Sequence, residues 1–457
     1  MTPRPVNKRA PRPRAAAHIT SILENGAQPP ERISASDIPR GFHFGATACG
    51  VKKKWGTLDL ALVSADSPAA CAAVFTTNRM KAAPVLLSAE HLRRSGGRMR
   101  ALAVNSGNAN CSTGAHGMHV SRTTARGVAS ALGCAPEQVF VCSTGVIGVP
   151  LPVEKITGAL PALSKMLGTS PRHFALMSRA IMTTDTRPKW AAAGVRIGGR
   201  TVRIAGCAKG AGMIHPQMAT MLAFVFTDAA IAPGLLRRAV REAAGRTFNC
   251  ITVDGDTSTN DTLAVFASGA SGVSVASHSS LATNHSRSYR QFCAALEHVC
   301  KQLALAIVAD GEGAQRVVEI EVRGARSAQD ADRAARTIAN SPLVKTALAG
   351  ADPNWGRILA AAGRSGARFH PDEATVWMAG IKVYARGRAL PFDERAAHRK
   401  LLSPFAKLAV DLGAQAAKRS TKKALSRHSS RVTRHLARMW TCDFTEDYVH
   451  INADYRT

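Results

Sequence analysis

The chain has 457 residues, of which 46% are hydrophobic and 20% are charged. This composition excludes a fully disordered chain and a small disulfide-stabilised scaffold, and the length suits about two or three domains or lobes. Lys and Arg outnumber Asp and Glu by 60 to 31, so the formal net charge is +29. A charge of this size favours a polyanionic partner, such as a nucleic acid, an anionic membrane or an acidic substrate.

Residues 1–40 form a basic segment with several prolines, and we expect a disordered arm that ends where ordered structure begins, near Gly41. An Arg-rich, acid-poor N-terminus is also typical of an organelle transit peptide. Four prolines within the first 13 residues oppose the amphipathic helix of such a peptide. The arm is therefore the preferred interpretation, and the transit peptide stays open.

The distribution of cysteines and of apolar runs indicates in which cellular compartment the protein is expected. The ten cysteines are scattered without a CxxC pair, which favours buried thiols in a reduced cytoplasm over a disulfide or zinc framework. No uninterrupted apolar run reaches the roughly 18–20 residues of a membrane span. The longest such runs are Met221–Phe226 and Leu303–Ala309. We therefore expect a cytoplasmic protein without a membrane span.

Apolar runs and helical periodicities alternate along the rest of the chain. Short apolar runs predict strands at Leu58–Val63, Ala69–Phe75, Met99–Val104, Val139–Cys142, Met221–Thr227, Leu263–Ser268, Val317–Val322 and Val449–Asn452, with a hairpin in Val195–Gly206. Helical segments are predicted at Val120–Leu132, Gly234–Ala244, Tyr289–Ala309, Val344–Ala349 and Arg357–Gly363. Strands and helices that intermix in this way indicate a mixed α/β or α+β fold.

The segment Gln415–Met439 has eight basic residues and no acid. Arg427, Arg431, Arg434 and Arg438 fall on one helix face, and its apolar residues fall on another, so we expect a basic amphipathic helix inserted in the body. Such a helix packs its apolar stripe on the body, or it binds an anionic membrane, a nucleic acid or an acidic partner. This segment and residues 1–40 together hold less than half of the net charge.

The segment with the most chemical information is Lys209–Phe226, in which a glycine turn that carries Lys209 leads to Ala219-Thr220 and then to an apolar strand. A Thr at the start of a buried strand presents its hydroxyl at a strand end, and its β-branched side chain is stiff. This arrangement suggests self-cleavage, in which Thr220 Oγ attacks the Ala219 carbonyl and water hydrolyses the resulting ester. The freed Thr220 would then use its own α-amine as base. The alternative is an ordinary Thr at a strand start.

Three further polar turns follow apolar segments. Ser143-Thr144-Gly145 offers a hydroxyl and a backbone N–H that can converge on one oxyanion, or it is a plain turn. The acidic run Asp254–Asp261 resembles a cation site in composition but misses the EF-hand spacing, so we predict no metal. Asp310–Gly313 presents Glu312 on a glycine-flanked turn, where it would bind a substrate ammonium group or orient the Thr220 amine, or the segment is a plain surface turn.

Taken together, these segments resemble the ornithine acetyltransferase family of arginine biosynthesis, the bifunctional ArgJ family. The resemblance runs from about Gly41 to the C-terminus, and its most specific part is Lys209–Phe226 with the Ala-Thr step. The matching stretches are Asn105–Asn110, Cys142–Gly148, Met182–Thr186, Lys209–Phe226, Thr252–Asp261, Asp310–Gly313, Asp352–Arg357 and Tyr448–Thr457.

The resemblance implies a mixed α/β, autoprocessed enzyme with an N-terminal-nucleophile-type Thr. Cleavage between Ala219 and Thr220 would give an α chain (1–219) and a β chain (220–457), which would associate as a heterotetramer of two α and two β chains. Thr220 would take acetyl from N²-acetylornithine and pass it to glutamate, and acetyl-CoA is a possible further donor. No other cofactor is implied.

The resemblance also implies roles for individual residues. Thr144 and Gly145 would form the oxyanion hole. The residues implied to contact substrate are Thr183, Lys209, Thr220, Glu312, Asn452 and Thr457. Lys209 suits a substrate carboxylate and Glu312 suits an ammonium group. If Thr183–Thr186 is a strand, Thr184 and Thr186 share one face and Thr183 lies on the other.

The chain departs from the family pattern in three places. His215 and Gln217 stand where the family often has smaller or different residues, the N-terminal arm is longer than usual, and Gln415–Met439 looks like an insertion. Two rival functions stay open, namely a self-processing amidase or aminopeptidase and a nucleic-acid-binding protein. The body shows no nucleic-acid-binding motif, and aromatic residues make up only 5% of the chain, so we do not favour nucleic acid as a partner.

Overall fold

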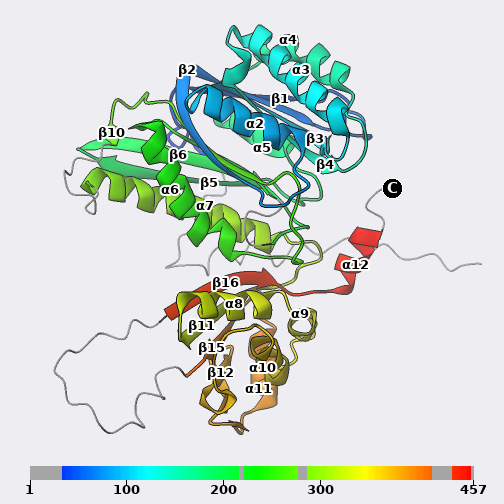
Figure 1. Cartoon of the computed structure of the whole chain (residues 1–457), viewed down its shortest axis with the longest axis vertical. Coiled ribbons are helices and arrows are strands. Elements are labelled where there is room, and N and C mark those ends of the chain that lie inside the picture. The colour runs from blue at the N-terminus through cyan, green and yellow to red at the C-terminus, as the bar shows by residue number, and fades with distance from the viewer. Residues whose placement is uncertain (1–32, 216–220, 276–285, 414–434, 454–457) are drawn as a thin grey trace, which may run out of the picture.

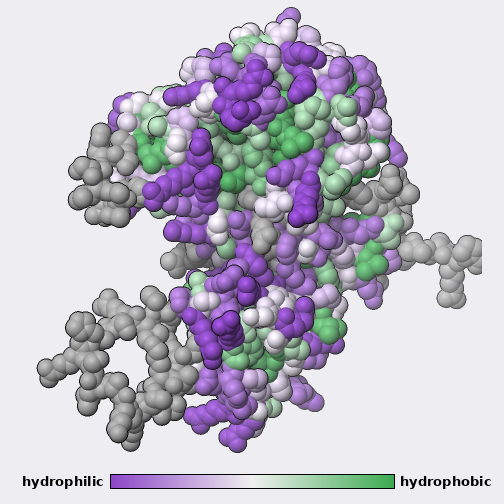
Figure 2. All heavy atoms as spheres, in the orientation of Figure 1, coloured by the Kyte–Doolittle hydropathy of each residue, from purple (hydrophilic) through white to green (hydrophobic). Residues whose placement is uncertain are grey.

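The computed structural model describes residues 33–215, 221–275, 286–413 and 435–453. Its described part is a mixed α/β fold, as the sequence predicts, with a larger body of one long sheet and its helices and a smaller sheet with its own helices (Figure 1). Hydrophilic residues cover much of both parts on the face shown in Figure 2, and hydrophobic residues form only small patches there.

The strands of the larger body form an eight-stranded sheet within the described residues. The order across this sheet is β4-β3-β2-β9-β7-β6-β5, and β1 pairs with β2 on the side of the path. The strands are β1 (Phe42–Thr47), β2 (Leu60–Phe75), β3 (Arg98–Asn108), β4 (Val139–Val146), β5 (Lys189–Ile197), β6 (Arg200–Lys209), β7 (Leu222–Thr227) and β9 (Thr262–Ala267).

Strand β2 joins the two halves of this sheet, one formed by β1, β3 and β4 and the other by β9, β7, β6 and β5. The sequence predicts two strands, Leu58–Val63 and Ala69–Phe75, but the structure has one 16-residue strand with a register shift between Ser64 and Ala69. The first part of β2 pairs with β1, and its second part pairs with β9. A bulge of this kind bends a strand, so one strand serves both halves and the predicted break is wrong.

Aromatic rings fill the layer between the two halves. Phe226 of β7 packs edge-on against Phe42 and Phe44 of β1, with ring centroids 5.2 and 5.0 Å apart. Phe266 of β9 lies 5.9 Å from Phe140 of β4 in the same way. Edge-to-face pairs at such distances add roughly 0.5–1.5 kcal/mol each beyond their burial. This core fixes how the strand ends of the two halves lie relative to one another.

Helices cover the outer faces of the two halves (Figure 1). On one side α2, α3 and α4 pack on β2, β3 and β4, and on the other side α6 and α7 pack on β5, β6, β7 and β9. Helix α5 packs beside β1 in the aromatic layer. These helices are α2 (Ala83–Arg94), α3 (Gly114–Leu132), α4 (Val153–Lys165), α5 (Pro171–Ala180), α6 (Pro233–Arg246) and α7 (Arg287–Ala309).

Helix α7 is the one helix of the described residues that is long and apolar enough to cross a membrane by length and composition. It packs along β5 and β6, and Phe292, Leu296 and Leu303 are fully buried in the largest hydrophobic cluster. The core helix of a globular protein passes the same test. The packing therefore accounts for its apolar character.

The smaller part is a six-stranded sheet of the described residues, in the order β14-β13-β12-β15-β11-β16. Its strands are β11 (Val317–Ala325), β12 (Thr375–Met378), β13 (Ile381–Ala385), β14 (Arg388–Ala389), β15 (Phe405–Asp411) and β16 (His435–Cys442). Its helices are α8 (Ala328–Ala339), α9 (Pro342–Ala349), α10 (Trp355–Gly363) and α11 (Glu394–Leu401). The short pair β8 (Ala230–Ile231) and β10 (Ser274–Val275) belongs to the larger body.

The predicted basic helix Gln415–Met439 is wrong where the structure describes it. His435–Met439 begins strand β16, which pairs antiparallel with β11, and residues 415–434 lie outside the described residues. Ala437 and Met439 pack against the core of the smaller sheet, while Arg438 pairs with Glu319 and Glu321. A short segment fits both a helical and an alternating pattern, and pairing with β11 decides between them.

Two other boundaries differ from the sequence prediction. Ile38 is buried in the core, and its carbonyl accepts a hydrogen bond from Arg203, so residues 33–40 are not part of a disordered arm. Residues 1–32 lie outside the described residues. The prediction of a strand at Val449–Asn452 is wrong, because this segment belongs to helix α12 (Glu446–Ala453). The segment is largely exposed and pairs with no strand among the described residues, and Asn452 donates a hydrogen bond to the Tyr448 carbonyl four residues earlier. The hairpin at Gly198-Gly199 is confirmed as β5–β6.

Candidate active site

The pocket lies where strand ends from both halves of the large sheet meet. It encloses about 280 Å³, near the lower end of the roughly 300–1,000 Å³ typical of small-ligand pockets. Six residues that the sequence places at a substrate or oxyanion site line it together, namely Thr144, Gly145, Thr183, Lys209, Glu312 and Asn452. These residues come from strand ends, loops and a helix spread over more than 300 positions.

Strand β4 brings Thr144 and Gly145 to the pocket. Gly145 pairs with Gly107 of the parallel strand β3 and has φ +134°, a conformation that L side chains rarely adopt. A Cβ at Gly145 would overlap the Gly107 backbone. The local backbone therefore requires glycine here, and both Thr144 and Gly145 line the pocket.

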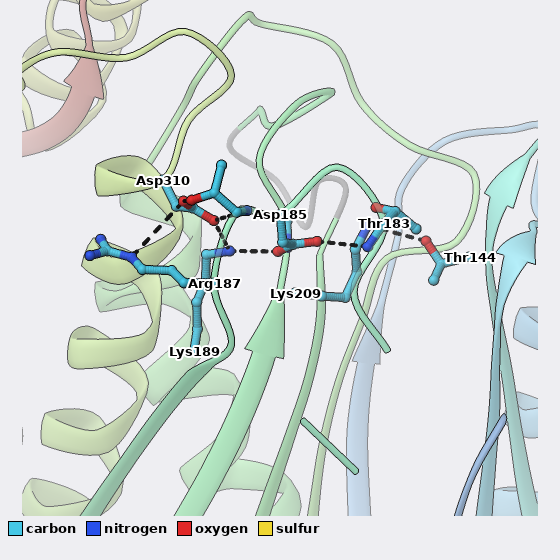
Figure 3. Close-up of polar contacts among 9 residues, drawn as sticks. Thr144, Thr183, Asp185, Arg187, Lys189, Lys209 and Asp310 are labelled. Atoms are coloured by element: carbon cyan, nitrogen blue, oxygen red, sulfur yellow. Dashed lines mark hydrogen bonds and ion pairs between the residues drawn. The ribbon is translucent and has the colours of Figure 1, made fainter. Parts of the chain in front are cut away.

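Lys209 is the last residue of β6 and is almost completely buried, with 4% of its surface exposed. Its Nζ donates a hydrogen bond to Thr144 Oγ1 at 3.2 Å (Figure 3). Burial lowers the pKa of the Lys209 ammonium, and the carboxylate of Asp185 opposes that shift. Because Thr144 Oγ1 accepts this bond, its own hydroxyl hydrogen is free to point at a ligand oxygen.

Glu312 and Asn452 also line the pocket and contact each other. Asn452 Nδ2 donates to Glu312 Oε2 at 2.8 Å, and it also caps the carbonyl of Tyr448 one turn earlier in α12. Only a helix places Asn452 and Tyr448 in this relation, so the helix that replaces the predicted strand is what aims Asn452. A Cβ at Gly212 would overlap the Glu312 carboxylate, so glycine lets the turn after Lys209 approach it.

Thr183 and Thr184 both line the pocket, although a strand would have put them on opposite faces. Residues 183–186 form successive bends rather than a strand, because Asp185 Oδ2 accepts the Thr183 N–H at 2.9 Å. Thr186 instead turns away and donates its hydroxyl to Asp310. The expectation that Thr184 and Thr186 share a face apart from Thr183 is therefore wrong.

The predicted cleavage pair, Ala219 and Thr220, and the predicted substrate contact Thr457 lie outside the described residues. The residues that flank the cleavage pair are described. Gly212 and Met213 line the pocket, and the Met221 N–H donates to Asp261 Oδ1 at 2.8 Å. Asp261 is fully buried, and burial raises the pKa of its carboxyl well above the usual value.

The acidic run 254–261 contributes to the site in a way that the sequence analysis missed. Asn260 Nδ2 donates to Ser143 O at 2.7 Å and to Ala109 O at 2.8 Å, so it supports the backbone just before Thr144. Asp254 accepts the Ile214 N–H at 2.8 Å, which holds the turn after Lys209. The dense polar run was visible in the sequence, but nothing in its spacing showed that its oxygens and amides bind backbone groups.

Comparisons with known proteins show the family to which the chain is similar. The model of the ArgJ family matches residues 43–457. The protein named arginine biosynthesis bifunctional protein ArgJ from Geobacter sulfurreducens is 48% identical over 92% of this chain and 99% of its own length. The protein of the same name from Thermus thermophilus is 45% identical over 92% and 99%.

Solved structures are similar over a smaller share of the chain. A crystal structure of argJ from Bacillus halodurans has 36% identity, covers 41% of this chain and 95% of its own, and has a TM-score of 0.38. A structure of ornithine acetyltransferase complexed with ornithine from Mycobacterium tuberculosis has 36% identity, covers 39% and 92%, and has a TM-score of 0.34.

Proposed function

Because the chain belongs to the ArgJ family of arginine-biosynthesis acetyltransferases, we propose that it transfers acetyl from N²-acetylornithine to glutamate through Thr220. The observation that carries this proposal is the convergence of Thr144, Gly145, Lys209 and Glu312 on one small pocket. Such a pocket offers oxyanion donors, a cation for a carboxylate and an acid for an ammonium group, which are the groups an acetylated amino acid requires.

The proposed nucleophile forms by self-cleavage. Thr220 Oγ attacks the Ala219 carbonyl, the peptide bond to the Thr220 nitrogen breaks, and water hydrolyses the resulting ester. The products are an α chain (1–219) that ends in a carboxylate and a β chain (220–457) with a free Thr220 amine. An α-amine has a reference pKa of about 7.7–8.0, so it can accept the hydroxyl proton near neutral pH.

Acetyl transfer then proceeds in two half-reactions. Thr220 Oγ attacks the acetyl carbonyl of acetylornithine, and the developing oxyanion accepts hydrogen bonds from the Thr144 hydroxyl and the Gly145 N–H. Ornithine leaves with the proton held on the Thr220 amine, and the acetyl ester remains on Thr220. The amine of glutamate attacks that ester and regenerates the hydroxyl, giving N-acetylglutamate.

Side chains at the ends of the pocket orient the substrate. Lys209 binds the α-carboxylate, which matches its position beside Thr144. Glu312 and Asn452 receive the ammonium end, with Asn452 holding the Glu312 carboxylate in place. Thr183 and Thr457 complete the contacts in this proposal. Acetyl-CoA would serve as a further acetyl donor, and two α and two β chains would assemble into a heterotetramer.

A cytoplasmic location belongs to the same proposal. All ten cysteines lie in the described residues and are free thiols, and burial raises the pKa of several, including Cys49, Cys207 and Cys442. Free thiols are typical of a reducing compartment.

Intact mass spectrometry of the wild type and of Thr220→Ala tests the cleavage step. We expect two chains split between Ala219 and Thr220 in the wild type and one uncut chain in the variant, because alanine has no hydroxyl to attack the carbonyl. Thr227→Ala is the matched control, since Thr227 is the last residue of β7, the strand that follows the cleavage pair, and this variant should cleave normally. An uncut wild-type chain would contradict the mechanism.

Activity assays separate the proposal from its rival. Purified protein given N²-acetylornithine and glutamate should release ornithine and form N-acetylglutamate in equal amounts. A self-processing amidase would instead release ornithine together with free acetate, with no dependence on glutamate. That outcome would refute acetyl transfer while leaving the cleavage mechanism intact.

A further inference from the structure

A buried ion network lies directly behind the pocket, outside the residues that line it. Lys189 Nζ donates to Asp185 Oδ1 and to Asp310 Oδ2, both at 2.5 Å (Figure 3). The three side chains are at most 4% exposed. Removing charges from water is costly unless they are paired and hydrogen-bonded. Because burying these charges is costly, we expect this network to have a role in the molecule.

Asp185 connects this network to two segments of the pocket. Its Oδ2 accepts the N–H of Thr183 at 2.9 Å, and its Oδ1 accepts the N–H of Gly210 at 2.7 Å. Thr183 lines the pocket, and Gly210 follows Lys209 directly with φ +150°. One carboxylate thus binds the backbone N–H of Thr183 and that of the residue directly after Lys209.

Asp310 connects the network to the third segment. It accepts the Thr186 N–H at 3.1 Å and the Thr186 hydroxyl, and it precedes Glu312 by two residues. In the proposed cleaved enzyme, Asp185 and Lys189 belong to the α chain and Asp310 belongs to the β chain. The network therefore ties the loops of Thr183, Lys209 and Glu312 together across the proposed cleavage.

The negative charge of Asp185 also acts on the pKa of Lys209. The charged groups around the Lys209 ammonium are Asp185, Lys189, Asp261, Glu312 and Lys52. Burial lowers the pKa of Lys209, Lys189 lowers it further, and the three carboxylates oppose both effects, Asp185 most strongly. Burial alone would raise the pKa of Asp185, but Lys189, Lys209 and the Gly210 N–H more than offset this and keep Asp185 ionised.

We propose that Asp185 is a positioning residue for acetyl transfer, which holds the Thr183 and Gly210 backbone and supplies a negative charge beside the segment that carries Lys209. Lys189 links Asp185 to Asp310 so that the Glu312 turn is positioned by the same network. This inference rests on the proposed function, in which Lys209 binds the substrate carboxylate.

The test is the pH dependence of KM for acetylornithine in the wild type, Asp185→Asn and Asp185→Glu. Asn keeps the size of the side chain and loses its charge, so the ammonium of Lys209 should be lost at lower pH. We expect KM near neutral pH to rise about tenfold and the alkaline limb of the profile to move to lower pH. Asp185→Glu keeps the charge, so its alkaline limb should stay at the wild-type position even if altered geometry raises KM.

Three outcomes decide the matter. A wild-type KM and an unmoved alkaline limb in folded Asp185→Asn would overturn the proposal. A limb that moves equally in Asp185→Asn and Asp185→Glu would also overturn it, because a merely structural role predicts the same defect in both. If Asp185→Asn does not fold, a displaced limb in Asp185→Glu alone overturns the proposal and an unmoved limb supports it. Failure of the proposed function is distinguishable, since the wild type itself would then form no N-acetylglutamate.

Discussion

Two charge clusters in this molecule pair carboxylates with basic side chains in different surroundings. Asp185, Lys189 and Asp310 lie behind the pocket and are almost fully buried. On the smaller sheet, Glu321 of β11 pairs with Lys407 of β15 at 2.8 Å and with Arg438 of β16 at 3.3 Å. The distances are similar, but the basic partners on the smaller sheet are 42% and 49% exposed.

The difference shows what burial does to an ion pair. On the smaller sheet, Glu321 is 9% exposed but both of its basic partners reach solvent, and pairs with exposed side chains contribute only about 0.2–1 kcal/mol. In the buried cluster, water cannot replace the partner, so a single truncation leaves buried charges with only their remaining partners, such as Arg187, which lies 3.9 Å from Asp310. The buried cluster of the larger body therefore positions the pocket, whereas the cluster on the smaller sheet only joins neighbouring strands.

Lys189→Met should cause the largest loss of stability of the variants compared here. It leaves the Asp185 and Asp310 carboxylates buried without their shared cation, and breaking such a pair typically costs about 3–5 kcal/mol. The free energy of unfolding is best measured by urea denaturation in the Thr220→Ala background, where we expect a single uncut chain. Lys407→Met in the same background is the matched control. Equal losses in the two variants would show that burial does not distinguish the two clusters.

Lys209→Met should affect activity more than stability. The Lys209 ammonium makes one described side-chain hydrogen bond, to Thr144, and is otherwise available to the substrate carboxylate. A hydrogen bond to a charged group contributes about 1.5–3 kcal/mol, so kcat/KM should fall about 10- to 100-fold. The measurement is steady-state kinetics with N²-acetylornithine and glutamate. A variant with unchanged kcat/KM would remove Lys209 from the proposed substrate site.

The same comparison explains which parts of the site the sequence could predict. Thr144, Gly145, Lys209 and Glu312 follow apolar strands or glycine turns, and local patterns together with the family resemblance were enough to single them out. Asp185 and Asp310 lie in segments that the sequence does single out, Met182–Thr186 and Asp310–Gly313, but no local pattern marks them or Lys189 as members of one ion network. Their roles depend on a contact between residues more than 120 positions apart, which arises only when the α7 end meets the loop before β5.

The fold divides in the same way. The β5–β6 hairpin and helix α7 follow from turn chemistry and periodicity that lie within the elements themselves. Strand β16 and helix α12 were predicted wrongly because their conformations depend on partners. His435–Met439 becomes a strand by pairing with β11, whereas the exposed segment of α12 forms a helix from which Asn452 reaches Glu312.

Lys407→Ala should have the smallest effect and should report the cluster on the smaller sheet directly. We expect a loss of about 0.2–1 kcal/mol that shrinks as salt is added, because surface pairs are screened.

Burial would raise the pKa of Glu321, but Lys407 and Arg438 more than offset this and hold it below its usual value. A carboxyl with a lowered folded-state pKa stabilises the fold above its unfolded pKa of about 4.3 and loses that contribution as the pH falls through the folded value. The difference in unfolding free energy between wild type and Lys407→Ala should therefore be present at pH 7 and vanish in acid. If this difference in unfolding free energy persists when Glu321 is protonated, the Lys407 side chain contributes by packing and not by its charge. The two clusters would then differ in the packing of their side chains and not in how burial affects an ion pair.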